Sequence, residues 1–259
     1  MPMLELRDVR LRYEISGPKQ APTIVLSNSL GTSLEMWDSQ LPVLAREFCV
    51  LRYDMRGHGQ STVTAGPYTI EQLAQDVILL LDHLDIEKVH FCGLSMSGLI
   101  GMWLALRNPQ RLRHLILCNT SPKIASAEIW NGRIETVRKS GMAAIVDGVI
   151  QRWFTPAFQA ASPAAIDSTR KMLLTTPPEG YVSCCAAIRD MDARASIASI
   201  QVPTLVVAGN SDQVTPPRDC QFIAERIAGA KYQQLPAAHL SNIEASEGFT
   251  AALLNFLKA

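Results

Sequence analysis

Apolar residues occur along the chain in short blocks that alternate with longer stretches of helical spacing. The blocks are rich in β-branched residues, Leu and Cys, and they occupy residues 23–27, 48–53, 89–92, 114–118 and 204–208. Continuous apolar blocks of this length predict strands buried on both faces. Between two of them, apolar side chains at positions 70, 73, 74, 77, 80, 81 and 84 have helical spacing. The alternation predicts an α/β fold with a mostly parallel central sheet flanked by helices.

Two regions depart from this alternation. Residues 4–6 and 11–15 alternate apolar with polar side chains, which predicts an antiparallel hairpin at one edge of the sheet. Between residues 121 and 199 the strand pattern stops, and the segment is helical in character with a break at the Thr-Thr-Pro-Pro-Glu-Gly of 175–180. We therefore expect an α/β core made of residues 1–120 and 200–259, with a helical cap inserted at residues 121–199.

The composition narrows the classes of function. With 47% hydrophobic and 19% charged residues among 259, the chain is typical of a globular protein. Its 24 Lys and Arg residues balance its 24 Asp and Glu residues, so we expect no nucleic-acid or membrane partner. No apolar run reaches the roughly 18 residues of a membrane span, and the first residues do not resemble a signal peptide. We expect a cytoplasmic location, while the sequence leaves the oligomeric state open.

The six cysteines and five histidines do not predict a metal site. The cysteines form no Cys-x-x-Cys pair, and no Cys/His cluster has the spacing of metal ligands. Three of the cysteines lie within the predicted strands. We therefore interpret the cysteines as buried free thiols of a protein in a reducing compartment.

A candidate nucleophile lies where the predicted strand at 89–92 meets an apolar helical stretch. The joining residues read Gly93-Leu94-Ser95-Met96-Ser97-Gly98. A strand, a Gly-x-Ser turn and a helix together predict a nucleophile elbow, with Ser95 exposed at the turn. Ser97 occupies the position of the usual second glycine, but a serine is small enough for the tight turn. The alternative is a serine that only caps the helix.

A serine hydroxyl needs a base, and a base needs an acid that orients it. His239 follows a strand-like stretch at 230–235 through a loop of small residues, so it can reach the edge of the sheet where α/β proteins bind ligands. Asp212 follows the block at 204–208, and its alternative role is that of a turn aspartate. The order Ser95, Asp212, His239 matches a known arrangement of the catalytic triad.

The remaining histidines fit other roles. His83 lies in a predicted helix, and His90 and His114 lie in predicted strands, so we interpret these three as scaffold residues. His58 lies in a glycine-rich loop ahead of the elbow.

An oxyanion hole is also expected beside the nucleophile. One donor should be the backbone N–H of Met96, which directly follows Ser95. The second should come from the loop after the strand at 23–27, where we predict the N–H of Leu30.

These motifs resemble the α/β-hydrolase superfamily along the whole chain. The resemblance rests on Gly-Leu-Ser-Met at 93–96, Arg-Gly-His-Gly-Gln-Ser at 56–61, Asp212 and His239. Within the superfamily, Leu-Ser-Asn-Ser-Leu-Gly-Thr at 26–32, Met-Trp-Asp at 36–38 and Tyr-Thr-Ile-Glu at 68–71 resemble the 3-oxoadipate enol-lactonases. Ser97 departs from the expected Gly-Gly after Ser-Met, and Ser246 stands near a common proline.

The resemblance implies a carboxylic-ester hydrolase of aromatic-compound catabolism. Its substrate would be a five-membered enol-lactone that carries a carboxymethyl group, and the product would be 3-oxoadipate. Neither a metal nor an organic cofactor is implied. The triad alone leaves open another small-ester, thioester or carbon–carbon bond hydrolase. It also leaves open a ligand receptor that keeps a slow triad, whereas a serine at 95 argues against dehalogenases and epoxide hydrolases, which use aspartate.

A carboxylate on the substrate calls for a cation in the predicted cap. Trp130 and Arg133 would share one face of a helix, and Trp153 is a third candidate. An arginine can hold a carboxylate through two parallel hydrogen bonds. The same residues also fit a surface arginine and core tryptophans, and Arg56 is a rival for the carboxylate.

Overall fold

The structure, a computed structural model, describes residues 3–5 and 8–259. Leu6 of the predicted first strand lies outside the described residues. The strands are β1 (Met3–Glu5), β2 (Arg10–Ser16), β3 (Thr23–Ser27), β4 (Cys49–Tyr53), β5 (Val89–Leu94), β6 (Leu112–Cys118), β7 (Thr204–Gly209) and β8 (Lys231–Leu235). The α-helices are α1 (Leu41–Leu44), α2 (Ile70–His83), α3 (Met96–Arg107), α4 (Ala127–Ser140), α5 (Ala143–Trp153), α6 (Pro156–Ala161), α7 (Pro163–Thr175), α8 (Pro178–Asp190), α9 (Pro217–Arg226), α10 (Ser241–Glu244) and α11 (Ser246–Leu257).

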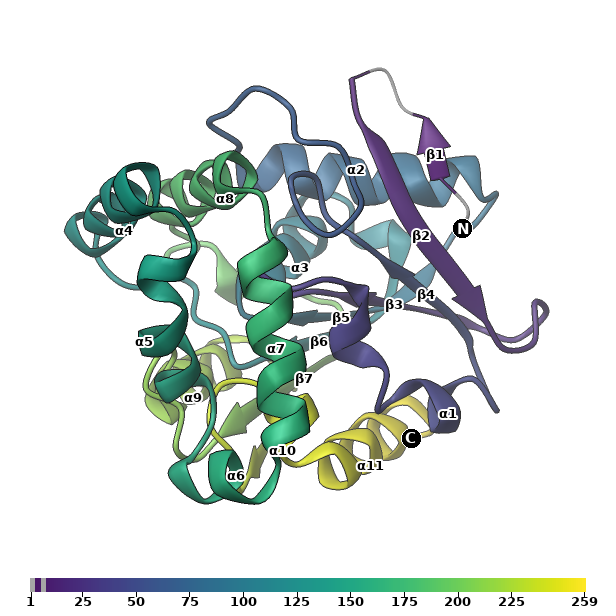
Figure 1. Ribbon diagram of the computed structural model, residues 1–259. Helices are drawn as coiled ribbons and strands as arrows, with labels where there is room; N and C mark the ends of the chain where they lie inside the picture. Colours follow the sequence, from purple (N-terminus) through teal and green to yellow (C-terminus); the bar gives the residue numbers. More distant parts are fainter. Residues whose placement is uncertain (1–2, 6–7) are drawn as a thin grey trace.

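The described strands form one sheet in the order β1-β2-β4-β3-β5-β6-β7-β8 (Figure 1). The pairs β1–β2 and β2–β4 are antiparallel, and every other neighbouring pair is parallel. The predicted edge hairpin and the mostly parallel sheet are both confirmed. Because β3 to β8 run in the same direction, the loops after them meet at one edge of the sheet, which is where open α/β sheets place their ligands.

Helices cover both faces of the sheet, as contacts of β6 illustrate. Successive strand residues point to opposite faces. His114 meets the ring of Phe256 from α11 at 5.2 Å between centroids. The next residue, Leu115, lies against Gly101 of α3, where an added Cβ would come within 2.9 Å of it. Both faces of the strand are covered, which explains the apolar run from Leu115 to Cys118.

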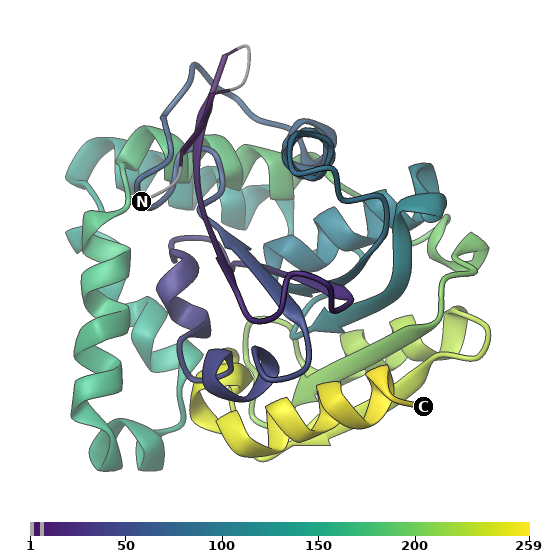
Figure 2. The ribbon, with the colours of Figure 1, turned by 90° about the vertical axis from the view of Figure 1, so that its right-hand side faces the viewer.

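The helices α4 to α8 gather on one side of the sheet (Figures 1 and 2). The predicted break at 175–180 is present, since α7 ends at Thr175 and α8 begins at Pro178. Pro177 lies between the two helices, and α7 cannot continue through it because proline lacks a backbone N–H. We propose that residues 121–199 form the cap of an α/β core.

Two further expectations concern the whole described chain. All six cysteines are buried free thiols, as predicted. Within residues 3–5 and 8–259, no helix combines the length and the apolar character that a membrane crossing requires.

Candidate active site

Ser95 lies at the sharp turn between β5 and α3. Its φ of 60° and ψ of −116° lie outside the regions that side chains other than glycine prefer, and its side chain makes no capping bond to the helix. A strained residue of this kind persists only where its surroundings hold it. The geometry is that of a nucleophile elbow and contradicts the alternative of a helix-capping serine.

Small residues on both sides of Ser95 make the turn possible. A Cβ at Gly93 would lie 2.2 Å from the backbone oxygen of Ser97, so only glycine fits there. Ser97 itself is fully buried, yet its hydroxyl has partners, because it donates to the carbonyl of Asn28 and accepts from Ser27 Oγ at 2.8 Å. The departure from the glycine pattern is therefore accommodated, and the hydroxyl ties the elbow to the end of β3.

His239 and Asp212 complete a chain of hydrogen bonds that starts at Ser95. The Nε2 atom of His239 lies 2.9 Å from Ser95 Oγ, and its Nδ1 atom lies 2.8 Å from Asp212 Oδ2. When Nδ1–H donates to the carboxylate, Nε2 is left as the acceptor of the serine proton. The side chains of His239 and Asp212 are 1% and 0% exposed, so water competes little for these bonds.

The two oxygens of Asp212 have different partners. Oδ1 accepts from the N–H groups of Val214 at 2.7 Å and Thr215 at 3.0 Å. Oδ2 accepts from His239, from the hydroxyl of Thr215 at 2.8 Å and from Asn119 Nδ2 at 3.0 Å. Burial on its own raises the pKa of Asp212, but the charge and hydrogen bond of His239, with the Asn119 bond, hold the pKa below its ordinary value. Asp212 thus forms the turn that its position predicted and also bonds His239, the candidate base.

A pocket of about 310 Å³ lies next to the hydrogen-bonded residues Ser95 and His239. Ser95, His239 and Leu30 line it from the core, and the predicted residues Trp130, Arg133 and Trp153 line it from α4 and α5. The predicted site residues therefore meet in one place, apart from Asp212 behind the histidine and Met96 at the start of α3.

The two tryptophans lie differently in the pocket. The ring of Trp153 lies 6.1 Å from that of His239, centroid to centroid, so it packs over the histidine. The indole N–H of Trp130 donates to the carbonyl of Ile124 at 2.6 Å. Trp130 in turn carries the guanidinium of Arg133 above its ring, with 5.7 Å between Cζ and the centroid. This stacking orients the arginine in the pocket.

Arg56, the rival for a carboxylate, is fully engaged elsewhere. Its Nε and Nη2 atoms form two parallel bonds to Asp76 at 2.8 and 2.7 Å, and Nη1 bonds Asp8 at 2.5 Å. It is 2% exposed and holds a glycine-rich loop in place. The structure therefore assigns Arg56 to the scaffold.

Sequence reasoning missed Arg152, which lines the same pocket as Arg133. Burial, followed by the positive charge of Arg133, lowers the pKa of Arg152. Two guanidinium groups thus repel each other in the pocket, and one of them, that of Arg133, donates a hydrogen bond to the Tyr181 hydroxyl at 3.2 Å. The sequence offered one signal, since Arg152 directly precedes the candidate Trp153 in the same predicted helical segment. Its side chain reaches the pocket, however, only when α4 and α5 pack together.

The loop predicted to hold an oxyanion donor is fixed by His58, a second residue without an assigned role in the sequence. The N–H of Gly31 donates to His58 Nε2 at 2.9 Å, and His58 is fully buried. Burial lowers the pKa of His58 to about 4, so the ring stays neutral and can accept that bond at pH 7. Met96 begins α3, and the first N–H groups of a helix lack intrahelical acceptors. Leu30 and Met96 remain predicted donors.

Within the described ranges, 3–5 and 8–259, no group of three or more His, Cys, Asp or Glu side chains is placed to hold a metal ion.

Comparisons with known proteins agree with this geometry. The sequence profile of the alpha/beta hydrolase fold family matches residues 22–246. The 3-oxoadipate enol-lactonase 2 of Acinetobacter baylyi is 42% identical over 255 residues, which cover 98% of this chain and 96% of the relative. The crystal structure of the enol-lactonase from Burkholderia xenovorans LB400 superposes with a TM-score of 0.98 at 44% identity, covering both chains fully. A hydrolase structure from Pseudomonas aeruginosa gives 0.97 at 45% identity, over 100% of this chain and 98% of that one. The chain belongs to the α/β-hydrolase fold family.

Proposed function

We propose that the protein hydrolyses 3-oxoadipate enol-lactone, a five-membered ring with a carboxymethyl group, to 3-oxoadipate. The observation that carries this is the hydrogen-bonded series Ser95, His239, Asp212 at a pocket that is also lined by three arginines, Arg133, Arg152 and Arg218. The name of the A. baylyi relative supports the same substrate, and the name of the B. xenovorans relative supports an enol-lactone. A cytosolic location and a role in aromatic-compound catabolism belong to this proposal.

The first half of the reaction forms an acyl-enzyme. Ser95 Oγ attacks the lactone carbonyl while His239 Nε2 takes the serine proton, and Asp212 stabilises the imidazolium. The N–H groups of Leu30 and Met96 would stabilise the negative charge on the carbonyl oxygen, and losing one such donor costs about 3 kcal/mol of barrier stabilisation. The ring C–O bond then breaks, and His239 returns its proton to the enolate oxygen, so the ring opens to an enol that stays attached to the serine.

The second half releases the product. His239 takes a proton from water, and the hydroxide attacks the ester carbonyl of the acyl-enzyme. The Ser95 oxygen leaves with the proton from His239, which restores the free enzyme. The enol becomes the 3-oxo group by proton transfer to carbon. In the first half of the reaction the leaving group is an enolate, which is stabilised. Its expulsion during ring opening is therefore easier than the attack of Ser95 on the carbonyl.

The arginines explain how a charged substrate is recognised. Arg133 and Arg152 line the same pocket, and the only bond from the Arg133 side chain within the described part of the chain goes to Tyr181. A carboxylate between them relieves the repulsion of two guanidinium groups and forms charge-assisted hydrogen bonds. The substrate's carboxymethyl group supplies such a carboxylate at one end, while the lactone carbonyl at the other meets Ser95.

Steady-state kinetics on two substrates test the proposal. The enol-lactone, generated from muconolactone, should have a higher kcat/KM than p-nitrophenyl acetate, because only the lactone carries a carboxylate, whose charge-assisted bond contributes about 1.5–3 kcal/mol. A higher kcat/KM for the neutral ester would favour another small-ester or carbon–carbon bond hydrolase. Turnover below about one product per chain per minute on both substrates would favour a ligand receptor with a slow triad.

A further inference from the structure

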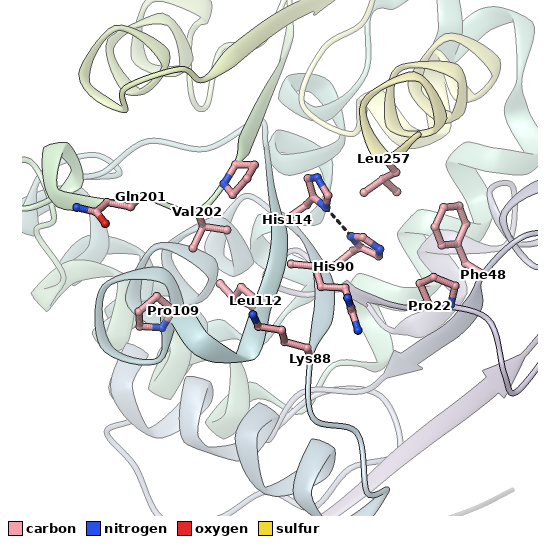
Figure 3. Close-up of a pocket in the computed structure, with 12 residues that line it drawn as sticks. Pro22, Phe48, Lys88, His90, Pro109, Leu112, His114, Gln201, Val202 and Leu257 are labelled. Atoms are coloured by element: carbon pink, nitrogen blue, oxygen red, sulfur yellow. Dashed lines mark hydrogen bonds between the residues drawn. The ribbon is translucent and has the colours of Figure 1, made fainter. Parts of the chain in front are cut away.

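A second pocket lies at the opposite edge of the sheet, by the amino ends of the parallel strands (Figure 3). Its volume is about 650 Å³, and His90 of β5 and His114 of β6 lie in its wall. His90 and Ser95 are on the same stretch of chain, five residues apart, so the two sites are separated by about 16 Å along the strand. The catalytic residues do not contact this pocket.

The two histidines form a pair. Their Nδ1 atoms are 3.0 Å apart and their rings stack with 4.9 Å between centroids. Figure 3 shows the rings joined by this bond, with Lys88, Phe48 and Leu257 around them. His90 is only 5% exposed, and the ring of Phe48 packs edge-on against it at 5.7 Å. Neither histidine takes part in the triad, so the mechanism leaves the pair without a role.

The charged side chains around the His90–His114 pair are positive. Lys88 and Arg113 line the pocket with the histidines, and none of the described Asp or Glu residues lines it. The ring of Phe256 contacts His114, and the ammonium of Lys231 lies 5.9 Å from the centroid of the same ring. The other wall residues are Gln201 and apolar side chains, which are Pro22, Phe48, Pro109, Leu112, Val202, Pro203 and Leu257. Glu47, next to Phe48 in sequence, is paired with Lys258 at 2.7 Å. In a chain with equal numbers of acids and bases, a pocket of this composition attracts anions.

The hydrogen bond between the two rings determines which nitrogen atom an added proton binds. In the neutral pair, one ring donates its Nδ1–H to the other ring's Nδ1, so the donor ring has a bare Nε2 and the acceptor ring carries Nε2–H. One added proton on the bare Nε2 leaves the bond between the rings intact. Both Nε2 atoms then carry a hydrogen, and the pair has one positive charge. A second proton would set two N–H groups against each other and break the bond.

We propose that this pocket is a binding site for a small oxyanion, a carboxylate or a phosphate, whose binding is coupled to the uptake of one proton by the His90–His114 pair. The protonated pair offers two Nε2–H donors, and Arg113 and Lys88 add charge. Burial, then the charges of His114 and Arg113, lowers the pKa of His90 to about 4, and burial with Arg113 lowers the pKa of His114. The pair is therefore neutral at pH 7 without an anion, and a bound anion raises its pKa.

Histidine-selective NMR of the ¹⁵N-labelled protein tests the proposal. Adipate and inorganic phosphate are titrated separately at constant ionic strength, between about pH 7.5 and pH 5.5. We expect saturable shifts of the His90 and His114 ring signals, with an affinity that rises by up to about tenfold for each pH unit lowered, as uptake of one proton requires. The exposed His83 is the internal control and should not respond. Tighter binding of adipate than of phosphate identifies a carboxylate ligand, and the reverse order a phosphate.

Two matched variants locate the anion. Arg113→Gln removes an exposed charge at the pocket and should weaken binding by at least about tenfold. Arg138→Gln removes an exposed charge on α4 and should leave binding unchanged. The proposal is overturned if the pair does not respond to either anion, if all the histidines shift together, or if Arg113→Gln binds as wild type does. Affinity independent of pH would also overturn the coupling to a proton.

Discussion

The replacement Arg133→Gln separates substrate recognition from chemistry. Arg133 projects from α4 into the pocket above Ser95, where Tyr181 bonds it at 3.2 Å and the ring of Trp130 supports it. Among the residues that the structure describes, the only hydrogen-bond partner of its guanidinium is the Tyr181 hydroxyl, and it forms no salt bridge. The arginine is therefore available to the carboxylate of a substrate, and its removal should act on binding.

The size of the effect follows from the bonds that are lost. A charge-assisted hydrogen bond to the carboxylate contributes about 1.5–3 kcal/mol, which corresponds to a rise in KM of about 10- to 150-fold. Arg152 stays in the pocket and keeps one positive charge there, so we expect the lower part of this range. The loss of the bond to Tyr181 should lower the free energy of unfolding by about 1 kcal/mol. The value of kcat should change little, because the carboxylate is held equally before and during ring opening.

The assay compares two substrates and two variants. Arg133→Gln and the matched Arg138→Gln, from the exposed face of the same helix, are measured on the enol-lactone and on p-nitrophenyl acetate. We expect KM to rise only for Arg133→Gln and only on the enol-lactone. Equal losses on both substrates would mean that the helix is damaged, and an unchanged KM on the lactone would refute the assignment of Arg133.

Four further outcomes follow from the geometry. Ser95→Ala should lower kcat by about 10⁶-fold with an unchanged circular dichroism spectrum, and a folded variant that keeps a few per cent of activity would exclude Ser95 as the nucleophile. Asp212→Asn should lower kcat by about 10⁴-fold, because an amide favours the wrong tautomer of His239; a loss below about tenfold would contradict that role. Ser97→Gly removes a buried hydroxyl that holds the end of β3, so urea unfolding should show a loss of about 1 kcal/mol, and an unshifted midpoint would speak against this bond. Burial lowers the pKa of His58 from 6.5 to about 4, so the unfolded chain takes up a proton that the folded chain does not. The free energy of unfolding should then fall by up to about 3 kcal/mol from about pH 6.5 to pH 4, and an equal acid slope in His58→Gln would disprove this origin.

Much of the fold could be predicted because its cause is local. A buried parallel strand is continuously apolar, so the blocks at 114–118 and 204–208 identify β6 and β7 directly. The nucleophile elbow could be predicted as well, since the turn at Ser95 needs small neighbouring residues, and these can be recognised in the sequence. His239 and Asp212 followed from their positions after β8 and β7, at the edge where the parallel strands end.

The rest depends on packing between distant elements. Nothing local marks Arg152 as a pocket residue, because its orientation is set where α5 packs against α4 and α7. The contact of His58 with Gly31 joins residues 27 positions apart. The pairing of His90 with His114 follows from the register of β5 on β6, which places these residues opposite each other. Sequence reasoning recognised both histidines as strand residues, but the register between the strands is a property of the sheet.

The central claim, that Ser95 opens the lactone, is tested most directly by stoichiometric labelling of the serine. The protein is titrated with diisopropyl fluorophosphate, the modified peptide is identified by mass spectrometry, and the remaining enol-lactone turnover is measured at each degree of labelling. We predict one label per chain, located on Ser95, and a loss of lactone turnover in direct proportion to it. Lactone turnover that persists when Ser95 is fully labelled would contradict the account.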